Sequence, residues 1–308
     1  MHFRAAHISA LIGPFVPGQV AIDEALQRAV FKPIGDLEEA REGFVNPFAI
    51  TKTDELTLMV NRCVFFAVRC DKRSLPASAI EERLAARVAG IEKQSGRKIG
   101  RKERKELKEA IRAELLPQQL PSQALVRGYF DLDRAIVVLD TSSQKRADEI
   151  HAALRSNLFL GGIEIGMTTV QVKAVPNLRM TAWLQDQTCP EPFTVDDEGE
   201  LSQGSDAVIA IRRSDMLAGE IRHLLSTGRV VTKLALTWAD RVSLVLSESL
   251  GLTKLKWTSS FYARAADLGQ SETADDTRAA ELTILTGDVR ELLHDVTEAF
   301  DGIANDEN

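Results

Sequence analysis

Aromatic residues make up only 6% of the 308-residue chain, which leaves few platforms for stacking on the bases of a single-stranded nucleic acid. Cysteine is scarcer still: Cys63, Cys70 and Cys189 are an odd number without metal-site spacing, so we expect reduced structural thiols. No apolar run is long enough to span a bilayer, and the N-terminal apolar stretch is interrupted at Gly13 and Pro14. These absences predict a cytoplasmic protein without a membrane segment.

Signatures of catalysis are also missing. The sequence has no glycine-rich loop followed by Lys-Ser or Lys-Thr, its five histidines lack metal-ligand spacing, and no Ser or Cys nucleophile motif is present. Asp131 and Asp133, in FDLDR, could hold a nuclease metal, but their position favours a hairpin turn. We therefore predict no catalytic residue, no metal and no cofactor.

Positive charge is concentrated in one stretch of an otherwise acidic chain. The formal net charge is -7, yet residues 83–112 hold eleven Lys or Arg against four Glu, a local charge of +7. On a helix of 3.6 residues per turn, one third of the circumference or less would hold Arg97, Arg101, Arg104, Lys105, Lys108 and Arg112. This basic stripe is either a solvated face with Glu–Lys pairs or a surface that contacts phosphates.

The first half of the chain predicts strands interrupted by a charged helical pair. CVFFAVRC (63–70) is typical of a strand, and two polar helices are expected from Ser74 or Pro76 to Gly96 and over about 101–116. A hairpin is expected around Asp131–Arg134, followed by a helix that Ser142 or Ser143 caps.

The second half predicts another mixture of strands and helices. Residues 187–204 are turn-rich and acidic, so we expect a boundary there. A helix is expected from Ser214 to Gly228, and strands are expected for AVIAIRR, VVTKLALTW, RVSLVLSE, LTKLKW and ELTILTG. The order predicts an α+β fold with antiparallel sheets, helices on one side and a projecting helical pair. The expected parts are residues 1–74 with 121–185, residues 75–120, and residues 186–308.

Several phrases together resemble one known family. They are SLPASAI, KERKELKEAIRAELLP, GRVVTKLALTW, LTKLKW and ELTILTGDVRELL. Their order and spacing, from about Leu75 to Phe300, are similar to those of the RdgC family of recombination-associated proteins. The resemblance implies horseshoe-shaped subunits that pair at both ends into a closed ring dimer, with double-stranded DNA in a positively lined hole. It also implies sequence-neutral binding in the nucleoid that restrains the RecA recombinase, without ATP or metal.

The resemblance and the basic stripe together suggest which residues contact DNA. The predicted set is Arg97, Lys98, Arg101, Lys102, Lys105, Lys108, Arg112, Arg212, Arg213, Lys233, Lys254 and Lys256. For the last three, a solvated sheet face is the alternative. The resemblance also places a dimer contact at Leu116, Pro117 and Leu120, where Leu120 stands at a position that family members can fill with Phe. Two other functions stay open: a metal-dependent DNA exonuclease, and a protein-interaction module that binds an acidic partner.

Overall fold

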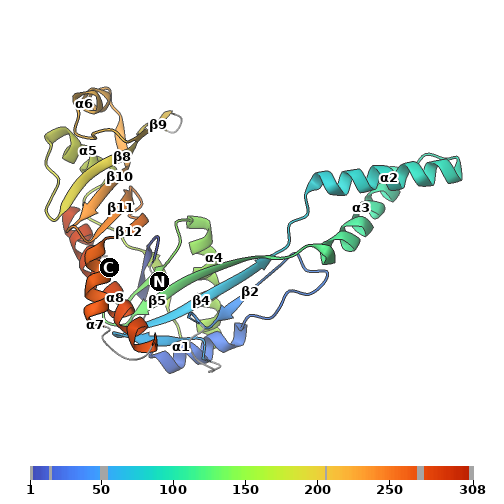
Figure 1. Ribbon diagram of the computed structural model, residues 1–308, viewed down its shortest axis with the longest axis horizontal. Helices are drawn as coiled ribbons and strands as arrows, with labels where there is room; N and C mark the ends of the chain where they lie inside the picture. Colours follow the sequence, from blue (N-terminus) through green and yellow to red (C-terminus); the bar gives the residue numbers. More distant parts are fainter. Residues whose placement is uncertain (1–2, 14–15, 49–54, 205–206, 269–273, 305–308) are drawn as a thin grey trace. The chain divides into compact units, whose positions relative to one another are not determined.

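The computed structural model describes residues 3–13, 16–48, 55–204, 207–268 and 274–304. These residues form two antiparallel sheets and eight α-helices (Figure 1), which confirms the α+β class. The chain divides into two compact units. The large unit contains residues 1–26, 46–66 and 127–308, and the small unit contains residues 27–45 and 67–126. The predicted division into three parts has different boundaries from these two units, and it stays a prediction.

The first sheet has the strand order β2-β4-β5-β6-β1-β7, with β3 paired to β4. Its strands are β1 (His7–Ile12), β2 (Ala40–Val45), β3 (Leu58–Val60), β4 (Cys63–Lys72), β5 (Ser122–Asp131), β6 (Ile136–Leu139) and β7 (Gly166–Thr169). The strand expected at 63–70 is confirmed as β4, and the expected hairpin is confirmed because Asp131 of β5 pairs with Ile136 of β6.

The second sheet has the order β12-β11-β10-β8-β9. Its strands are β8 (Phe193–Gln203), β9 (Ala207–Arg212), β10 (Val230–Trp238), β11 (Val242–Ser247) and β12 (Leu252–Trp257). Four predicted strands are confirmed here, but the interpretation of residues 187–204 as turns is wrong from Phe193 onward, because β8 pairs on both sides. Its many carboxylates suggested a loop, but two of them, Glu198 and Glu200, pair with Lys254 and Lys233 of the same sheet.

The helices are α1 (Gln19–Leu26), α2 (Ala77–Ser95), α3 (Arg101–Leu115), α4 (Gln144–Leu160), α5 (Pro176–Asp186), α6 (Gly219–Ser226), α7 (Ser259–Leu268) and α8 (Ala274–Ala299). The expected charged pair is confirmed as α2 and α3. Gly96 ends α2 with φ +66°, a left-handed conformation that favours glycine. Ser143 caps α4, where its hydroxyl accepts a hydrogen bond from the Arg146 amide at 3.3 Å.

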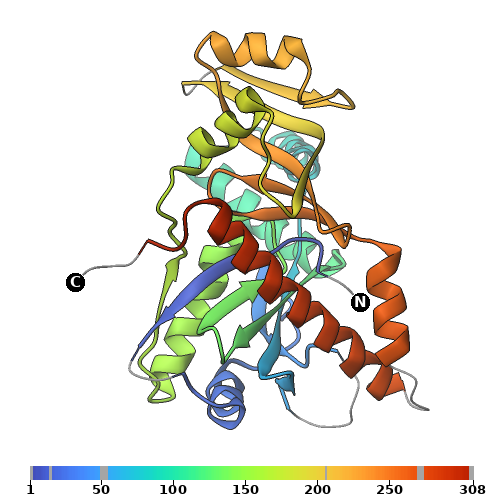
Figure 2. The ribbon, with the colours of Figure 1, turned by 90° about the vertical axis from the view of Figure 1, so that its left-hand side faces the viewer.

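Two predictions in the second half are wrong. Helix α6 begins at Gly219 and not after Ser214, because the Asp215 carboxylate holds a separate turn by accepting the Leu217 amide at 2.8 Å. ELTILTG is not a strand but part of α8, the long red helix that Figure 2 shows crossing the large unit. Its β-branched threonines suggested a strand, yet the Thr286 hydroxyl donates to the Leu282 carbonyl of its own helix at 2.9 Å.

The core of the large unit joins both sheets to α8. Phe65 and Tyr129 from the first sheet, Trp238 from the second, and Leu285 and Val289 from α8 belong to one buried cluster. The small unit has a much smaller core between α2 and α3, formed by Ile80, Leu84, Ile111 and Leu115. Among the described residues, no helix combines the length and apolarity that crossing a membrane requires.

Candidate nucleic-acid interface

The basic stripe lies on α3 of the small unit from Arg101 onward, beside the face that packs against α2, whereas Arg97 precedes the helix. Ile111 and Leu115 are buried in that contact, and Leu107 packs at its edge. Successive helical residues are about 100° apart, so Arg104 and Lys108 flank the buried face while Arg101 and Lys105 lie further round. The stripe is therefore divided into cations that lie close to α2 and cations that point away from it.

Four cations of this region are paired with carboxylates. Lys108 lies 2.5 Å and Arg104 3.9 Å from Glu81 of α2. Arg97 makes two hydrogen bonds to Glu103, at 2.7 and 2.9 Å, and Arg112 pairs with Glu39. The hydrogen bond from Lys108 lowers the pKa of Glu81, and the one from Arg97 lowers the pKa of Glu103. These four cations must give up an existing partner before they bind a phosphate.

The other predicted contacts of this helical region have no such partner. Among the residues that the structure describes, no ion pair engages Lys98, Arg101, Lys102 or Lys105, and all four side chains are exposed. Glu106 and Glu109 are exposed on the same helix, so the local surface is positive but not purely so. We call Lys98, Arg101, Lys102 and Lys105 the free cations; they are the part of the region that is ready to receive an anion.

On the second sheet, most of the predicted DNA contacts lie opposite carboxylates of β8. Lys233 lies 2.9 Å from Glu200, Lys254 pairs with Glu198, and Arg212 stands opposite Glu198 in the β8–β9 ladder. Burial raises the pKa of Asp196, and the nearby charge of Lys256 acts to lower it. Arg213 follows β9 in a left-handed backbone conformation, with φ +54°. Since Lys233 and Lys254 pair with the acidic strand, this face is closer to a solvated sheet face than to a surface that contacts DNA.

The three residues of the predicted dimer contact differ in accessibility. Leu116 is buried, Pro117 is exposed, and Leu120 is 92% exposed. Leu116 therefore packs inside the chain at the end of α3, whereas Leu120 presents its apolar side chain to solvent.

The two aspartates considered for a nuclease metal form a structural cluster with Arg290 of α8. Asp131 is fully buried, and Arg290 donates to both of its oxygens at 2.6 and 2.9 Å. The amides of Asp133 and Arg134 donate to the same carboxylate, which closes the hairpin turn. Asp133 pairs with Arg62 at 2.5 Å and with Arg290 at 3.3 Å.

This cluster engages both oxygens of the Asp131 carboxylate with hydrogen-bond donors. In the described part of the chain, no group of three or more His, Cys, Asp and Glu residues has the geometry of a metal site. Arg290 was not singled out from the sequence, and no sequence signal marks it, because it lies 159 residues from Asp131.

Comparison with known proteins identifies a matching family model and relatives that are similar over nearly the whole chain. The family model described as "Putative exonuclease, RdgC" matches residues 1–303. A protein of Cupriavidus pinatubonensis named "Recombination-associated protein RdgC" is 31% identical over 304 residues, which cover 98% of this chain and 99% of that protein. Proteins of the same name from Psychromonas ingrahamii and Laribacter hongkongensis are 29% and 31% identical, again over 98% of this chain and 99% of theirs.

Proposed function

Because the chain belongs to the RdgC family of recombination-associated proteins, we propose that it binds double-stranded DNA without reading base sequence and modulates recombination. The observation that carries this proposal is the set of four free cations, Lys98, Arg101, Lys102 and Lys105, on and beside α3. Long cationic side chains displace the counterions of the duplex and gain affinity from phosphates alone. Phosphate contacts carry no direct base information, so the binding is sequence-neutral.

The charge distribution supports a confined contact with DNA. The stretch 83–112 carries a formal charge of +7, and the rest of the chain carries -14. An acidic remainder repels phosphates, which restricts DNA to the basic stripe. The sheet cations contribute less in this proposal, because Glu198 and Glu200 already neutralise Lys254 and Lys233.

The proposal extends to assembly and to biological role. Two subunits form a closed ring around the duplex, and the exposed Leu120 lies at one of the contacts between them. A ring retains DNA by topology, so modest phosphate contacts suffice. Occupation of DNA in the nucleoid then limits access of the RecA recombinase, with no requirement for ATP or metal.

An exonuclease is the second candidate, and it rests on the description of the family model. Such an enzyme needs carboxylates that can bind metal. Asp131 is committed to Arg290 and to two backbone amides, and Asp133 is committed to two arginines. This engagement favours the DNA-binding proposal over the exonuclease.

A matched pair of double variants tests the proposal. Arg101→Ala/Lys105→Ala removes two free cations, whereas Arg104→Ala/Lys108→Ala removes the two that pair with Glu81. Both variants remove the same charge from the same helix. We expect the first to weaken binding about equally on unrelated duplexes and to flatten the salt dependence by roughly 0.9 for each phosphate that is no longer neutralised. The second should weaken binding less.

Fluorescence anisotropy with labelled duplexes of unrelated sequence, titrated with salt, measures both quantities. Unchanged affinity in Arg101→Ala/Lys105→Ala would exclude α3 as the contact surface. Loss of affinity on one sequence alone would contradict sequence-neutral binding.

A further inference from the structure

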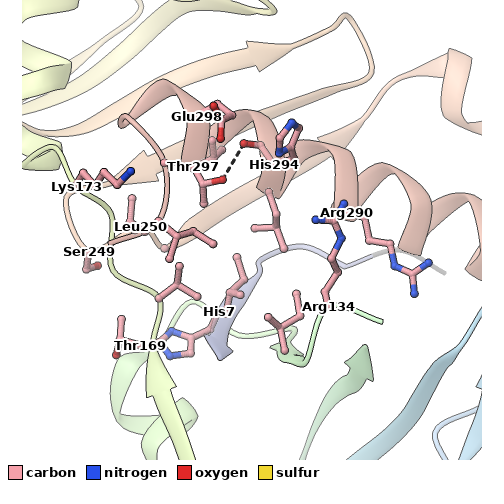
Figure 3. Close-up of a pocket in the computed structure, with 18 residues that line it drawn as sticks. His7, Arg134, Thr169, Lys173, Ser249, Leu250, Arg290, His294, Thr297 and Glu298 are labelled. Carbon is pink, nitrogen blue, oxygen red and sulfur yellow. Dashed lines mark hydrogen bonds between the residues drawn. The ribbon is translucent and has the colours of Figure 1, made fainter. Parts of the chain in front are cut away.

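A pocket of about 410 Å³ lies within the large unit, between the first sheet, the C-terminal half of α8 and the turn that joins β11 to β12 (Figure 3). Its volume falls in the range of roughly 300–1,000 Å³ that is usual for ligand pockets. None of its lining residues belongs to the basic stripe or to the small unit. The proposed DNA contact therefore does not account for it.

The lining combines apolar side chains, here called the floor, with charged side chains, here called the rim. The floor is formed by Ile8, Ile136, Val170, Leu250, Leu293, Val296 and Ile303. At the rim, Arg134 and Lys173 are exposed, and no ion pair engages either one among the described residues. Arg290 also reaches the pocket, but Asp131 and Asp133 neutralise its charge. Glu298 is the acidic residue of the rim.

The two unpaired cations lie at opposite sides of the floor. Figure 3 shows Lys173 beyond Leu250 on one side and Arg134 below Arg290 on the other. One small anion would meet one of them, whereas an extended chain with several carboxylates meets both and lays an apolar side chain between them.

The backbone beside the pocket already binds one extended segment. The Lys173 amide donates to the Gly302 carbonyl, and the Ala304 amide donates to the Gln171 carbonyl, each at 3.0 Å. In the described residues, β7 (Gly166–Thr169) is the last strand of its sheet, and the chain beyond it pairs with residues 302–304 beside the pocket, which is the kind of backbone pairing that extended peptides form. A peptide is thus a better match to this rim than a compact small molecule.

We propose that this pocket binds an acidic peptide segment of a partner protein, one in which apolar side chains lie between carboxylates. The apolar side chains fill the floor, and Arg134 and Lys173 each bind a carboxylate. The negative charge of Glu298 repels the carboxylates of the same ligand and so limits how many of them bind at the rim.

A peptide array tests the proposal on the full-length protein. The probes have the form Asp-Asp-X-X-Asp-Asp, where each X is Ile, Leu, Val, Phe, Met or Trp, with control peptides in which Lys replaces Asp or Ser replaces X. The strongest binder is then titrated by fluorescence anisotropy. We expect Lys173→Gln and Arg134→Gln each to weaken binding about tenfold, the effect of removing one charge-assisted hydrogen bond. Glu298→Gln should strengthen it.

Lys145→Gln, an exposed charge change outside the pocket, is the matched control and should leave the affinity unchanged. DNA binding by the same variants should equal that of the unsubstituted protein, so this test can fail while the DNA proposal stands. The proposal would be overturned if no acidic peptide bound more tightly than its Lys-substituted control. Weaker DNA binding in Lys173→Gln or Arg134→Gln, with peptide binding unchanged, would also overturn it by assigning the two cations to DNA.

Discussion

At the scale of single residues, buried polar groups determine which side chains are structural. Asp131 is fully buried and accepts four hydrogen bonds, two from Arg290 and two from backbone amides. A buried carboxylate of this kind is stabilising only while its partners remain. The sequence showed the hairpin turn at this aspartate but could not show its distant arginine.

Removing the buried charge should therefore destabilise the protein. We expect Asp131→Asn to lower the free energy of unfolding by about 3 kcal/mol, because Arg290 loses its main partner in a buried site. Asp133→Asn is the control: its side chain is 42% exposed, so we expect a loss below about 1 kcal/mol. Urea denaturation measures both, and equal losses would contradict the structural role of Asp131.

A second buried polar group makes stability depend on pH. His151 is buried, its Nε2 atom has no hydrogen-bond partner among the described residues, and its ring lies 5.6 Å from that of His7. Burial lowers the pKa of His151 to about 4, from an ordinary value of 6.5. The unfolded chain therefore takes up the proton first as pH falls below 6.5, and the folded state loses stability until about pH 4.

Replacing this histidine should remove that loss. We expect the free energy of unfolding of the unsubstituted protein to fall by about 2 kcal/mol more than that of His151→Leu between pH 7 and pH 4.5. Comparing the two proteins cancels the titration of the carboxylates that they share. Chemical denaturation at several pH values gives the difference. Parallel curves of unfolding free energy against pH would contradict the account, because they would show that the folded and unfolded states protonate His151 at the same pH.

At the scale of elements, periodicity predicted structure where local and tertiary preferences agree. The β4 strand, the β5–β6 hairpin, the α2–α3 pair and the Ser143 cap all followed from short patterns. The predictions for β8 and for the first part of α8 failed because packing with distant strands overrode composition. In α8, Leu282, Leu285 and Val289 recur at helical spacing and are buried, a signal that the β-branched residues obscured.

The same scale explains why the basic stripe needs a small apolar core. Ile111 is 2% exposed and helps hold α3 against α2. We expect Ile111→Ala to cost about 2–4 kcal/mol locally, so amides of α2 and α3 should exchange faster while those of the large unit do not change. DNA affinity should fall as well, because the free cations lose their common scaffold.

Hydrogen exchange followed by mass spectrometry measures this effect, with Glu109→Ala, on the exposed face of α3, as control. Faster exchange throughout the large unit would contradict an independent core in the small unit.

At the scale of the whole molecule, charge and family membership lead to the function. The sequence identified the basic stripe and the family: α3 carries the stripe from Arg101 to Arg112, and the family model matches residues 1–303. It could not separate the free cations from the paired ones, because Glu39 and Glu81 meet the stripe only after folding. The acidic partners of Lys233 and Lys254 were hidden in the same way, in a strand that composition marked as a loop.

The most direct test of the central claim compares matched linear and closed-circular duplexes, titrated with salt in the presence of magnesium. The account predicts binding that does not depend on sequence, falls steeply with salt, is retained better on circles, and leaves every DNA end intact. Shortened linear ends would contradict it and make the protein a nuclease, and absence of binding at moderate salt would contradict it altogether.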